Sequence, residues 1–214
     1  MREIAKGPEP SSLTAHRNSL GNYGNYNDKD ALRRKLVKEQ RGLCCYCMDR
    51  IRDDQDTKIE HWRPQSRYPE QQLVYRNLLA ACPGGMGERK RKSQQHCDTH
   101  KGSQDLSWNP ADPSHEIETR IRYRLDGSIW SDEGAFDAEL NNVLNLNVAV
   151  LKNHRRGMLD DIAKWYERAN ERKGATRSWL QHQREKWLPE RGELKPYCQI
   201  VVWFLDQRFS RLRQ

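Results

Sequence analysis

Hydrophobic residues recur at helical spacing in two parts of the chain. Between residues 30 and 40, Leu32 and Leu36 lie four positions apart, and Gly42 follows where a left-handed residue would end a helix. In the C-terminal half, the same spacing marks segments near 136–145, 148–172, 175–187 and 197–212. We therefore expect a helix before residue 42 and a mainly α-helical C-terminal region.

A second pattern, in which apolar and charged residues alternate, predicts a β-hairpin between residues 117 and 130. Apolar residues alternate with arginines there until the turn-forming pair Asp126-Gly127. Residues 50–110 instead mix short strand-like pieces with loops rich in glycine and proline, which is typical of a functional site. Together these elements indicate an α+β fold.

Residues 1–28 contain several prolines and glycines among serines and asparagines, so we expect an arm without regular structure that wraps around the rest of the chain. Tyr23 and Tyr26 are its candidate anchors. After this arm we expect a cysteine-containing domain over residues 29–112, followed by a hairpin and a helical region over residues 113–214.

A length of 214 residues suits one domain with a substantial extension. Charged residues make up 32% of the chain and hydrophobic residues 35%, a balance that favours disorder unless other residues build a core. The 7 tryptophans, the 8 tyrosines and the periodic segments indicate a folded protein with a highly solvated surface. The net charge of +8 favours a polyanionic partner without identifying one.

Apolar runs in the sequence stay well short of the roughly 20 residues that span a bilayer, and the N-terminus lacks the hydrophobic segment of a signal peptide. We therefore expect a cytoplasmic protein with no membrane partner. Disulfides are rare in that compartment, so the cysteines gathered within residues 44–97 indicate a metal site. Cys45 within this range and the distant Cys198 are expected to be packing residues.

Cys44 and Cys47 form a CxxC pair, and Cys82 and Cys97 complete a set of four thiolates that suits a tetrahedral structural zinc (Zn²⁺). Bound zinc would stabilise this loop-rich region directly, because few apolar side chains are available to hold it. Two alternatives remain open. The cysteines could be ordinary buried thiols, or His96 could replace Cys97 as the fourth ligand.

Three short motifs lie between and after these cysteines. They are Ile59-Glu60-His61-Trp62-Arg63-Pro64, Tyr75-Arg76-Asn77-Leu78-Leu79 and Cys97-Asp98-Thr99-His100-Lys101-Gly102. In their order and in their position among zinc cysteines, they resemble the HNH nuclease family, in which an acidic-His pair, an Asn and a helical His or Asn build a ββα-metal site. The resemblance covers roughly residues 30–110 and implies that residues 29–112 are a zinc-stapled HNH nuclease domain.

The resemblance assigns a role to each motif residue. His61 would be the general base that takes a proton from water, and the side-chain carbonyl of Asn77 would orient its imidazole. Glu60 and His100 would bind one catalytic divalent ion, Mg²⁺ or Mn²⁺, which would offset charge on the departing oxygen. Aspartate is the commoner family residue at position 60, so the longer side chain of Glu60 would shift the metal.

Four basic residues are candidate contacts to the phosphates of a nucleic acid. Arg63 and Lys101 lie beside the motif residues, and Arg89 and Lys90 lie in a basic loop before Cys97. For the loop, a merely solvated surface is an equally open interpretation. The arginines of the predicted hairpin carry less weight, because alternating charge is expected on any exposed strand.

Within the HNH family, the chain resembles the PtuB proteins of Septu and retron-associated anti-phage defence systems, through residues 40–48, 60–66, 77–82 and 96–102. The resemblance implies an endonuclease that cuts DNA or RNA as the effector of a defence complex. Its partners would be a PtuA-like ATPase and, in some systems, a retron reverse transcriptase with its RNA–DNA product. Two other functions stay open: a non-catalytic, zinc-containing adaptor that binds nucleic acid, and a nuclease restricted to RNA such as tRNA. The sequence does not separate DNA from RNA, because the base and the metal act on the phosphate.

Overall fold

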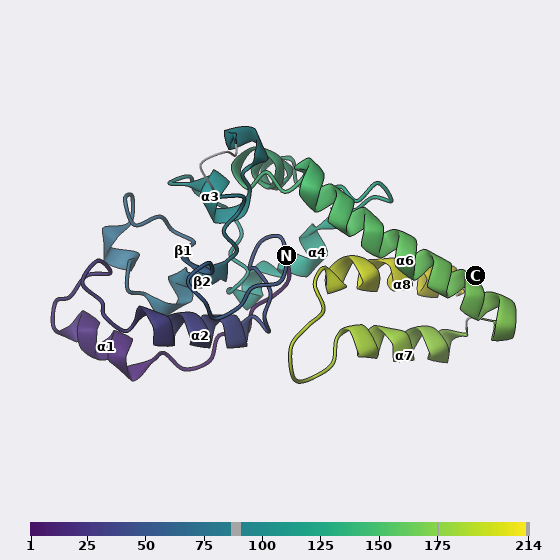
Figure 1. The fold of residues 1–214 in the computed structure, drawn as a ribbon, viewed down its shortest axis with the longest axis horizontal. Coiled ribbons are helices and arrows are strands. Elements are labelled where there is room, and N and C mark those ends of the chain that lie inside the picture. Colours follow the sequence, from purple (N-terminus) through teal and green to yellow (C-terminus); the bar gives the residue numbers. More distant parts are fainter. Residues whose placement is uncertain (87–90, 175, 213–214) are drawn as a thin grey trace.

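The computed structural model describes residues 1–86, 91–174 and 176–212, which form an α+β fold that is mostly helical (Figure 1). The α-helices are α1 (Ser11–Asn18), α2 (Lys29–Glu39), α3 (Cys97–Lys101), α4 (Ile117–Arg120), α5 (Gly134–Ala138), α6 (Ala149–Lys173), α7 (Arg177–Trp187) and α8 (Cys198–Arg211). The strands are β1 (Lys58–His61), β2 (Leu78–Ala81), β3 (Arg122–Tyr123) and β4 (Ile129–Trp130). Short 3-10 or π-helical turns lie at Pro69–Gln71, Tyr75–Asn77, Lys92–Gln94, Pro113–His115 and Glu139–Val143.

Helix α2 has the predicted spacing and leads into the first cysteine pair. Leu32 and Leu36 are fully buried on its inner face. The helix ends at Glu39, and Gly42 adopts a φ of +76° while its N–H donates to the carbonyl of Val37 at 2.9 Å. Glycine suits this left-handed position because it has no Cβ. The expected helix and its end are confirmed.

Strands β1 and β2 pair antiparallel and support the candidate site. His61 lies opposite Leu78, and Glu60 lies opposite Leu79. Because successive side chains of a strand point to opposite faces, Glu60 and His61 project to different sides of the β1–β2 pair. All residues of β2 are buried, so the pair is fixed in the core.

The predicted hairpin is present but shorter than expected. Strands β3 and β4 pair with Arg122 opposite Trp130, and Gly127 has a φ of +81° in the turn between them. The first residues of the predicted strand form the helical turn α4 instead, which buries Ile117. The sequence pattern did not reveal this turn, because Ile117 and Ile121 are four positions apart and this spacing suits a helix as well as a strand.

The N-terminal arm follows the rest of the chain as expected, but the expectation that it lacks regular structure is wrong for α1. This helix completely buries Leu13, the one residue within it that is buried, so it lacks the repeated apolar spacing that reveals a helix. Farther along the arm, Tyr26 is buried and its hydroxyl lies 2.9 Å from Oγ of Ser12. At the start of the arm, the N–H of Ile4 donates to the carbonyl of Pro110 at 2.8 Å. The arm is therefore held at several points.

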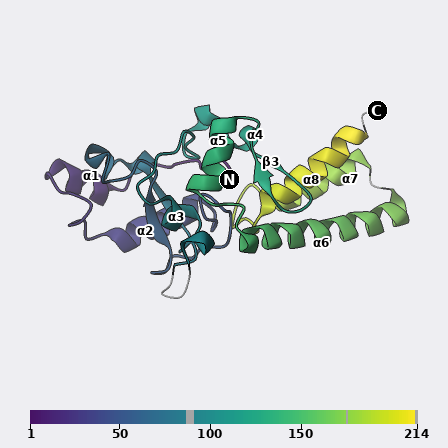
Figure 2. The same cartoon turned by 90° about the horizontal axis from the view of Figure 1, so that it is seen from above.

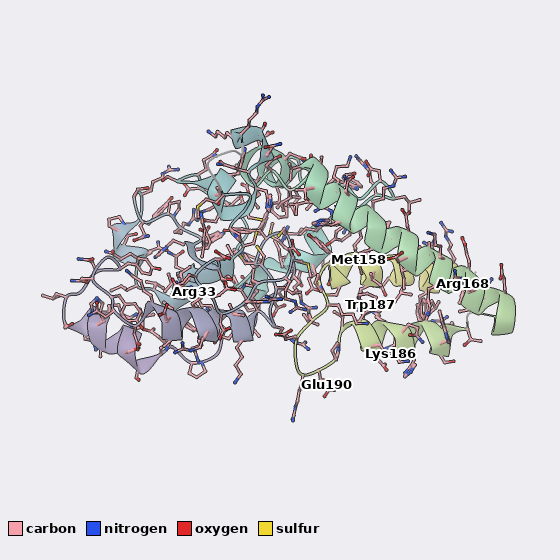
Figure 3. All side chains as sticks on the ribbon, in the orientation of Figure 1. Arg33, Met158, Arg168, Lys186, Trp187 and Glu190 are labelled. Carbon is pink, nitrogen blue, oxygen red and sulfur yellow. The ribbon has the colours of Figure 1, made fainter. Side chains whose placement is uncertain are left out.

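The helical C-terminal region is confirmed. Helices α6, α7 and α8 extend together away from the β1–β2 pair (Figures 1 and 2). Met158 of α6 and Trp187 of α7 line a shared pocket, whereas Arg168 and Lys186 are exposed on the outer surface of this region (Figure 3). The buried face of α8 includes Ile200, Val201, Val202, Phe204 and Leu205.

One large hydrophobic core joins these parts. It includes Leu13 from the arm, Leu36 from α2, Leu79 from β2 and Phe204 from α8. The cysteine-containing region and the helical region therefore pack on a common interior. Among the described residues, no helix combines the length and the apolar composition needed to cross a membrane.

Candidate functional site

The four predicted zinc cysteines come together in the core. Their sulfur atoms all lie within 4.8 Å of one another, with Sγ of Cys44 3.9 Å from Sγ of Cys97 and Sγ of Cys47 3.7 Å from Sγ of Cys82. Tetrahedral zinc with Zn–S bonds of about 2.3 Å places its sulfurs about 3.8 Å apart. All four side chains are buried. The cluster could therefore hold a metal ion such as zinc.

Backbone N–H groups are directed at the sulfurs of this four-cysteine cluster. The N–H of Cys82 lies 3.3 Å from Sγ of Cys44, and the N–H of Asp49 lies 3.4 Å from Sγ of Cys47. Burial raises the pKa of Cys44, but hydrogen bonds from the neighbouring thiols outweigh it and hold this pKa well below its usual value. Both features favour a thiolate at Cys44, the form of cysteine that binds metal, whereas the pKa values of Cys47 and Cys97 are raised while no metal is bound.

The alternative with His96 as the fourth ligand is not the arrangement found. Cys97 belongs to the four-cysteine cluster, and Nδ1 of His96 lies beside it, 3.2 Å from Sγ of Cys97 and 4.0 Å from Sγ of Cys82. Cys45 and Cys198 are buried outside the cluster, as expected for packing residues.

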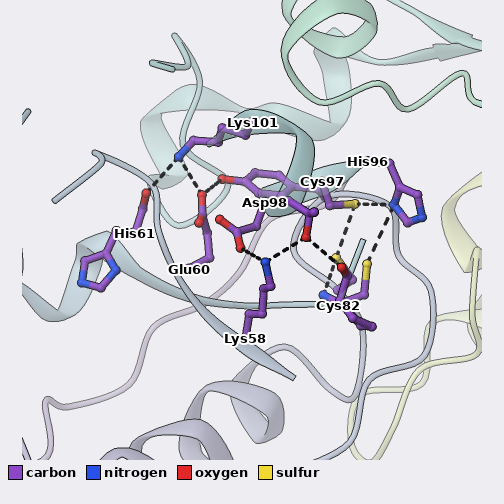
Figure 4. A network of polar contacts seen from close by, with 12 residues as sticks. Lys58, Glu60, His61, Cys82, His96, Cys97, Asp98 and Lys101 are labelled. Carbon is purple, nitrogen blue, oxygen red and sulfur yellow. Dashed lines mark hydrogen bonds and ion pairs between the residues drawn. The ribbon is translucent and has the colours of Figure 1, made fainter. Parts of the chain in front are cut away.

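Glu60 is almost completely buried, and its carboxylate already has partners (Figure 4). Its Oε1 atom accepts from the hydroxyl of Tyr46 at 2.7 Å and lies 2.8 Å from Nζ of Lys101. Burial raises the pKa of Glu60 well above its usual value, and the neighbouring Asp98 adds to this rise while Lys101 opposes it. Glu60 is thus an internal group with one carboxylate oxygen left for another contact.

Lys101 differs from its expected role as a phosphate contact. Its side chain is 1% exposed, and Nζ donates to the backbone carbonyl of His61 at 3.0 Å as well as pairing with Glu60. The methylene chain of Lys101 packs in the core, and its ammonium group links helix α3 to the end of strand β1. The ammonium group faces the interior rather than a surface where a nucleic acid would lie.

Asp98, which sequence reasoning left without a role, lies next to Glu60. The two carboxyl groups are close enough to influence each other's pKa, and Oδ2 of Asp98 lies 3.0 Å from Nζ of Lys58. Burial raises the pKa of Asp98, but the neighbouring Glu60 and the ammonium of Lys58 outweigh it and lower this pKa. Its position directly after a zinc cysteine was the signal that could have identified it.

His61 is held in one tautomer. Its Nε2 atom lies 3.0 Å from the backbone carbonyl of Gln72, and Nδ1 lies 3.3 Å from the side-chain nitrogen of Gln65. A carbonyl only accepts hydrogen bonds, so the neutral ring carries its proton on Nε2 and its lone pair on Nδ1. Burial lowers the pKa of His61 to about 4, which keeps the ring neutral near pH 7. The lone pair therefore faces Gln65, whose side chain is exposed.

Asn77 is buried, but its side chain does not take the expected position on the imidazole. Oδ1 accepts from the N–H of Arg63 at 2.6 Å, and Nδ2 donates to the carbonyls of Arg63 and Gln71 at 3.0 and 3.1 Å. Asn77 thus fixes the loop that follows His61. The contact expected of it is made by the carbonyl of Gln72, while the side-chain amide of Asn77 is held by backbone groups of the loop.

His100 makes a different contact from its neighbours on α3. Asp98 and Lys101 are three positions apart on α3 and face Glu60, whereas the ring of His100 projects elsewhere and its Nδ1 lies 2.9 Å from the carbonyl of Val143. Within the described part of the chain, the four-cysteine cluster is the one group of three or more potential metal-binding side chains. Asp98 and Lys101 are thus the neighbours of Glu60 on α3, and the metal-binding role of His100 stays a prediction, for which the lone pair of Nε2 would be the ligand atom.

Arg63 lies on the loop after β1 and is partly exposed. Its guanidinium carbon is 4.4 Å from the ring centre of Trp62 and 5.2 Å from that of Tyr68, and Nη1 lies 3.8 Å from Asp105. These contacts hold the guanidinium group in place near His61. The other two candidate phosphate contacts, Arg89 and Lys90, lie outside the described residues.

No protein-family model matches the chain, and no curated protein matches it in sequence. What the chain does is therefore inferred from its own residues. The arrangement described above offers two things chemically: a sulfur site suited to zinc, and a neutral, oriented histidine that follows the buried Glu60 on β1.

Proposed function

We propose that the chain is a metal-dependent endonuclease of the HNH type that hydrolyses phosphodiester bonds in DNA or RNA. The observation that carries the proposal is the state of His61: a neutral imidazole, fixed through Nε2, with the lone pair of Nδ1 directed toward an exposed side chain. A general base needs this arrangement to take a proton from a water molecule.

The neighbouring chain segments support the same reaction. His61 ends strand β1, Asn77 ends the turn before strand β2, and Asp98 lies in helix α3, so the residues follow the order strand, loop, helix. Movement of the exposed Gln65 side chain would open Nδ1 of His61 to water and to a phosphate. Arg63 and the net charge of +8 would favour the approach of a polyanion.

Glu60 and Asp98 are the proposed ligands of a catalytic Mg²⁺ or Mn²⁺ ion. Carboxylate oxygens suit these ions, and Mg²⁺ commonly uses one or two carboxylates together with water and substrate phosphate. The fit is supported by the influence of the two carboxyl groups on each other's pKa, a sign of close negative charges that a cation between them would balance. His100 stays a further candidate ligand of this ion, because the carbonyl of Val143 holds the proton on Nδ1 and leaves the lone pair on Nε2. When bound, the ion would stabilise negative charge at the phosphate.

A role in anti-phage defence is proposed on the resemblance of the motifs to PtuB. The partners would be a PtuA-like ATPase and, in some systems, a retron reverse transcriptase with its RNA–DNA product. The extended region of α6, α7 and α8 offers surface for a partner at a distance from strand β1, which ends at His61 (Figure 1). The restriction to RNA such as tRNA remains a variant of this proposal with every residue role unchanged.

Cleavage assays on labelled plasmid DNA and on total cellular RNA test the proposal, with and without the ATPase partner. The variants are His61→Ala, Asp98→Asn and, as a matched control, His182→Ala, which changes an exposed histidine of α7. We expect cleavage by the wild type and the control in Mg²⁺ or Mn²⁺, none in EDTA, and a loss on the order of 10²–10⁴-fold with His61→Ala. Equal cleavage by His61→Ala and wild type would refute the assignment.

The alternative of a zinc-containing adaptor is favoured by one observation. Glu60 is already paired with Lys101 and Tyr46, so the carboxyl pair is partly satisfied without a metal. An adaptor would bind nucleic acid with the same affinity in the wild type and in His61→Ala, and neither protein would cleave it. Loss of cleavage with retained binding in His61→Ala would exclude the adaptor.

A further inference from the structure

A residue of the N-terminal arm packs directly on the proposed general base. The ring centre of Tyr23 lies 4.5 Å from that of His61, and the two planes meet at 88°. Such perpendicular contacts between aromatic rings are favourable and fix the relative orientation of the rings. Tyr23 lies well before the motifs in sequence, so the arm contributes to the surroundings of His61.

One residue connects both rings. The backbone carbonyl of Gln72 accepts from Nε2 of His61 at 3.0 Å, and Oε1 of the same Gln72 accepts from the N–H of Tyr23 at 3.0 Å. The imidazole and the arm are therefore held by the same short segment. A shift of either ring would break a hydrogen bond to Gln72 or the contact between the rings.

The arm around Tyr23 is itself held in place. Nζ of Lys29 lies 4.9 Å from the centre of the Tyr23 ring and donates to the carbonyl of Gly24 at 3.1 Å. On the other side, the backbone N–H groups of Asn22 and Asn25 each donate to the other residue's side-chain oxygen, at 2.8 and 3.1 Å. Tyr23 is thus placed against His61 by local structure.

We propose that Tyr23 is a positioning residue for His61. Its ring and its N–H, together with Gln72, hold the imidazole with the proton on Nε2 and the lone pair of Nδ1 toward Gln65. The effect of Tyr23 on catalysis rests on the proposed nuclease function, but its effect on the imidazole does not.

The test compares Tyr23→Ala, Tyr23→Leu and Tyr23→Phe with Tyr166→Ala, which removes a partly buried ring of α6 outside the site. The first readout is the pattern of long-range ¹⁵N–¹H correlations of the His61 ring, assigned with His61→Gln, which reports the tautomer and the ring-current shift from Tyr23. The second is kcat and KM for nucleic-acid cleavage. Zinc content and melting temperature confirm that each variant is folded.

We expect Tyr23→Phe and Tyr166→Ala to keep the wild-type tautomer and kcat. Tyr23→Ala and Tyr23→Leu should lose the ring-current shift, mix the tautomers and lower kcat by about 10- to 100-fold, with KM little changed. An unchanged His61 tautomer in folded Tyr23→Ala and Tyr23→Leu would overturn the proposal, and so would an equal loss with Tyr23→Phe. If the wild type does not cleave nucleic acid, the nuclease proposal fails, and the NMR pattern still decides the role of Tyr23.

Discussion

Nζ of Lys101 lies 2.8 Å from Oε1 of Glu60, and both side chains are almost completely buried. An ion pair in this setting depends on each partner, because removing one leaves the other without compensation in a medium of low polarity. The same ammonium group reaches the backbone carbonyl of His61, so the pair also joins α3 to β1.

Replacing Lys101 by Met keeps the length of the side chain and removes its charge. We expect Lys101→Met to lower the free energy of unfolding by roughly 3–5 kcal/mol. In the Glu60→Gln variant, Lys101→Met should lower the free energy of unfolding by clearly less, because no buried carboxylate is then left unpaired. Urea denaturation of the two single variants and the double variant measures this difference. Additive effects would show that the two side chains do not interact.

Zinc is expected to hold α3 in place. The helix comprises Cys97–Lys101, which is too short to be stable alone, and its first residue belongs to the four-cysteine cluster. We expect about one zinc per wild-type chain, little in Cys82→Ala and the full amount in Cys45→Ala, a matched change of a buried cysteine outside the cluster. Elemental analysis gives the zinc content, and hydrogen exchange should show faster exchange in α3 of Cys82→Ala. Folded wild-type protein without zinc would contradict this expectation.

The three hydrogen bonds of the buried Asn77 side chain all go to backbone groups of the loop after His61. Asn77→Ala leaves these groups unsatisfied, so we expect the free energy of unfolding to fall by roughly 2–4 kcal/mol. Asn153→Ala, at an exposed position of α6, is the control and should change little. Thermal and urea denaturation measure both variants. A near-neutral Asn77→Ala would mean that water or a rearranged loop replaces these bonds.

Burial lowers the pKa of His61 from 6.5 to about 4, so the unfolded chain takes up a proton in this range while the folded chain does not. The contribution of neutral His61 to stability is therefore complete above pH 6.5 and is lost as the pH falls toward 4. Between these limits, we expect the difference in unfolding free energy between wild type and His61→Gln to shrink by roughly 3 kcal/mol. Denaturation at constant ionic strength measures it. A constant difference would show that the pKa of His61 is ordinary.

The sequence was sufficient for features that depend on local spacing. The helix that carries Leu32 and Leu36, the end of that helix at Gly42 and the helical C-terminal region all follow from periodicity and backbone preference. The four-cysteine cluster was also predictable, because a CxxC pair followed by two further cysteines within a short stretch of chain is a spacing typical of metal sites.

The side-chain partners within the site were not predictable from spacing. The interior position of Lys101, the pairing of Glu60 with Asp98 and the backbone contacts of Asn77 depend on which face of α3 and which side of the loop meet β1. The pattern of residues in so short a helix does not determine how α3 is rotated about its own axis. That rotation is set by Cys97 in the four-cysteine cluster and by packing in the core. Contacts between distant segments, such as Tyr23 with His61, have no local signal at all.

Helix α6 contains 25 residues, which corresponds to a rod about 37 Å long. This length is comparable to the diameter of a small domain, so its far end is separated from the β1–β2 pair by the width of another protein. Under the proposed function, a partner protein bound at that end of α6 would not overlap with a nucleic acid bound at His61. Under the proposed function, α6 would be a spacer that lets one end of the chain be anchored in an assembly while its opposite end meets a second macromolecule.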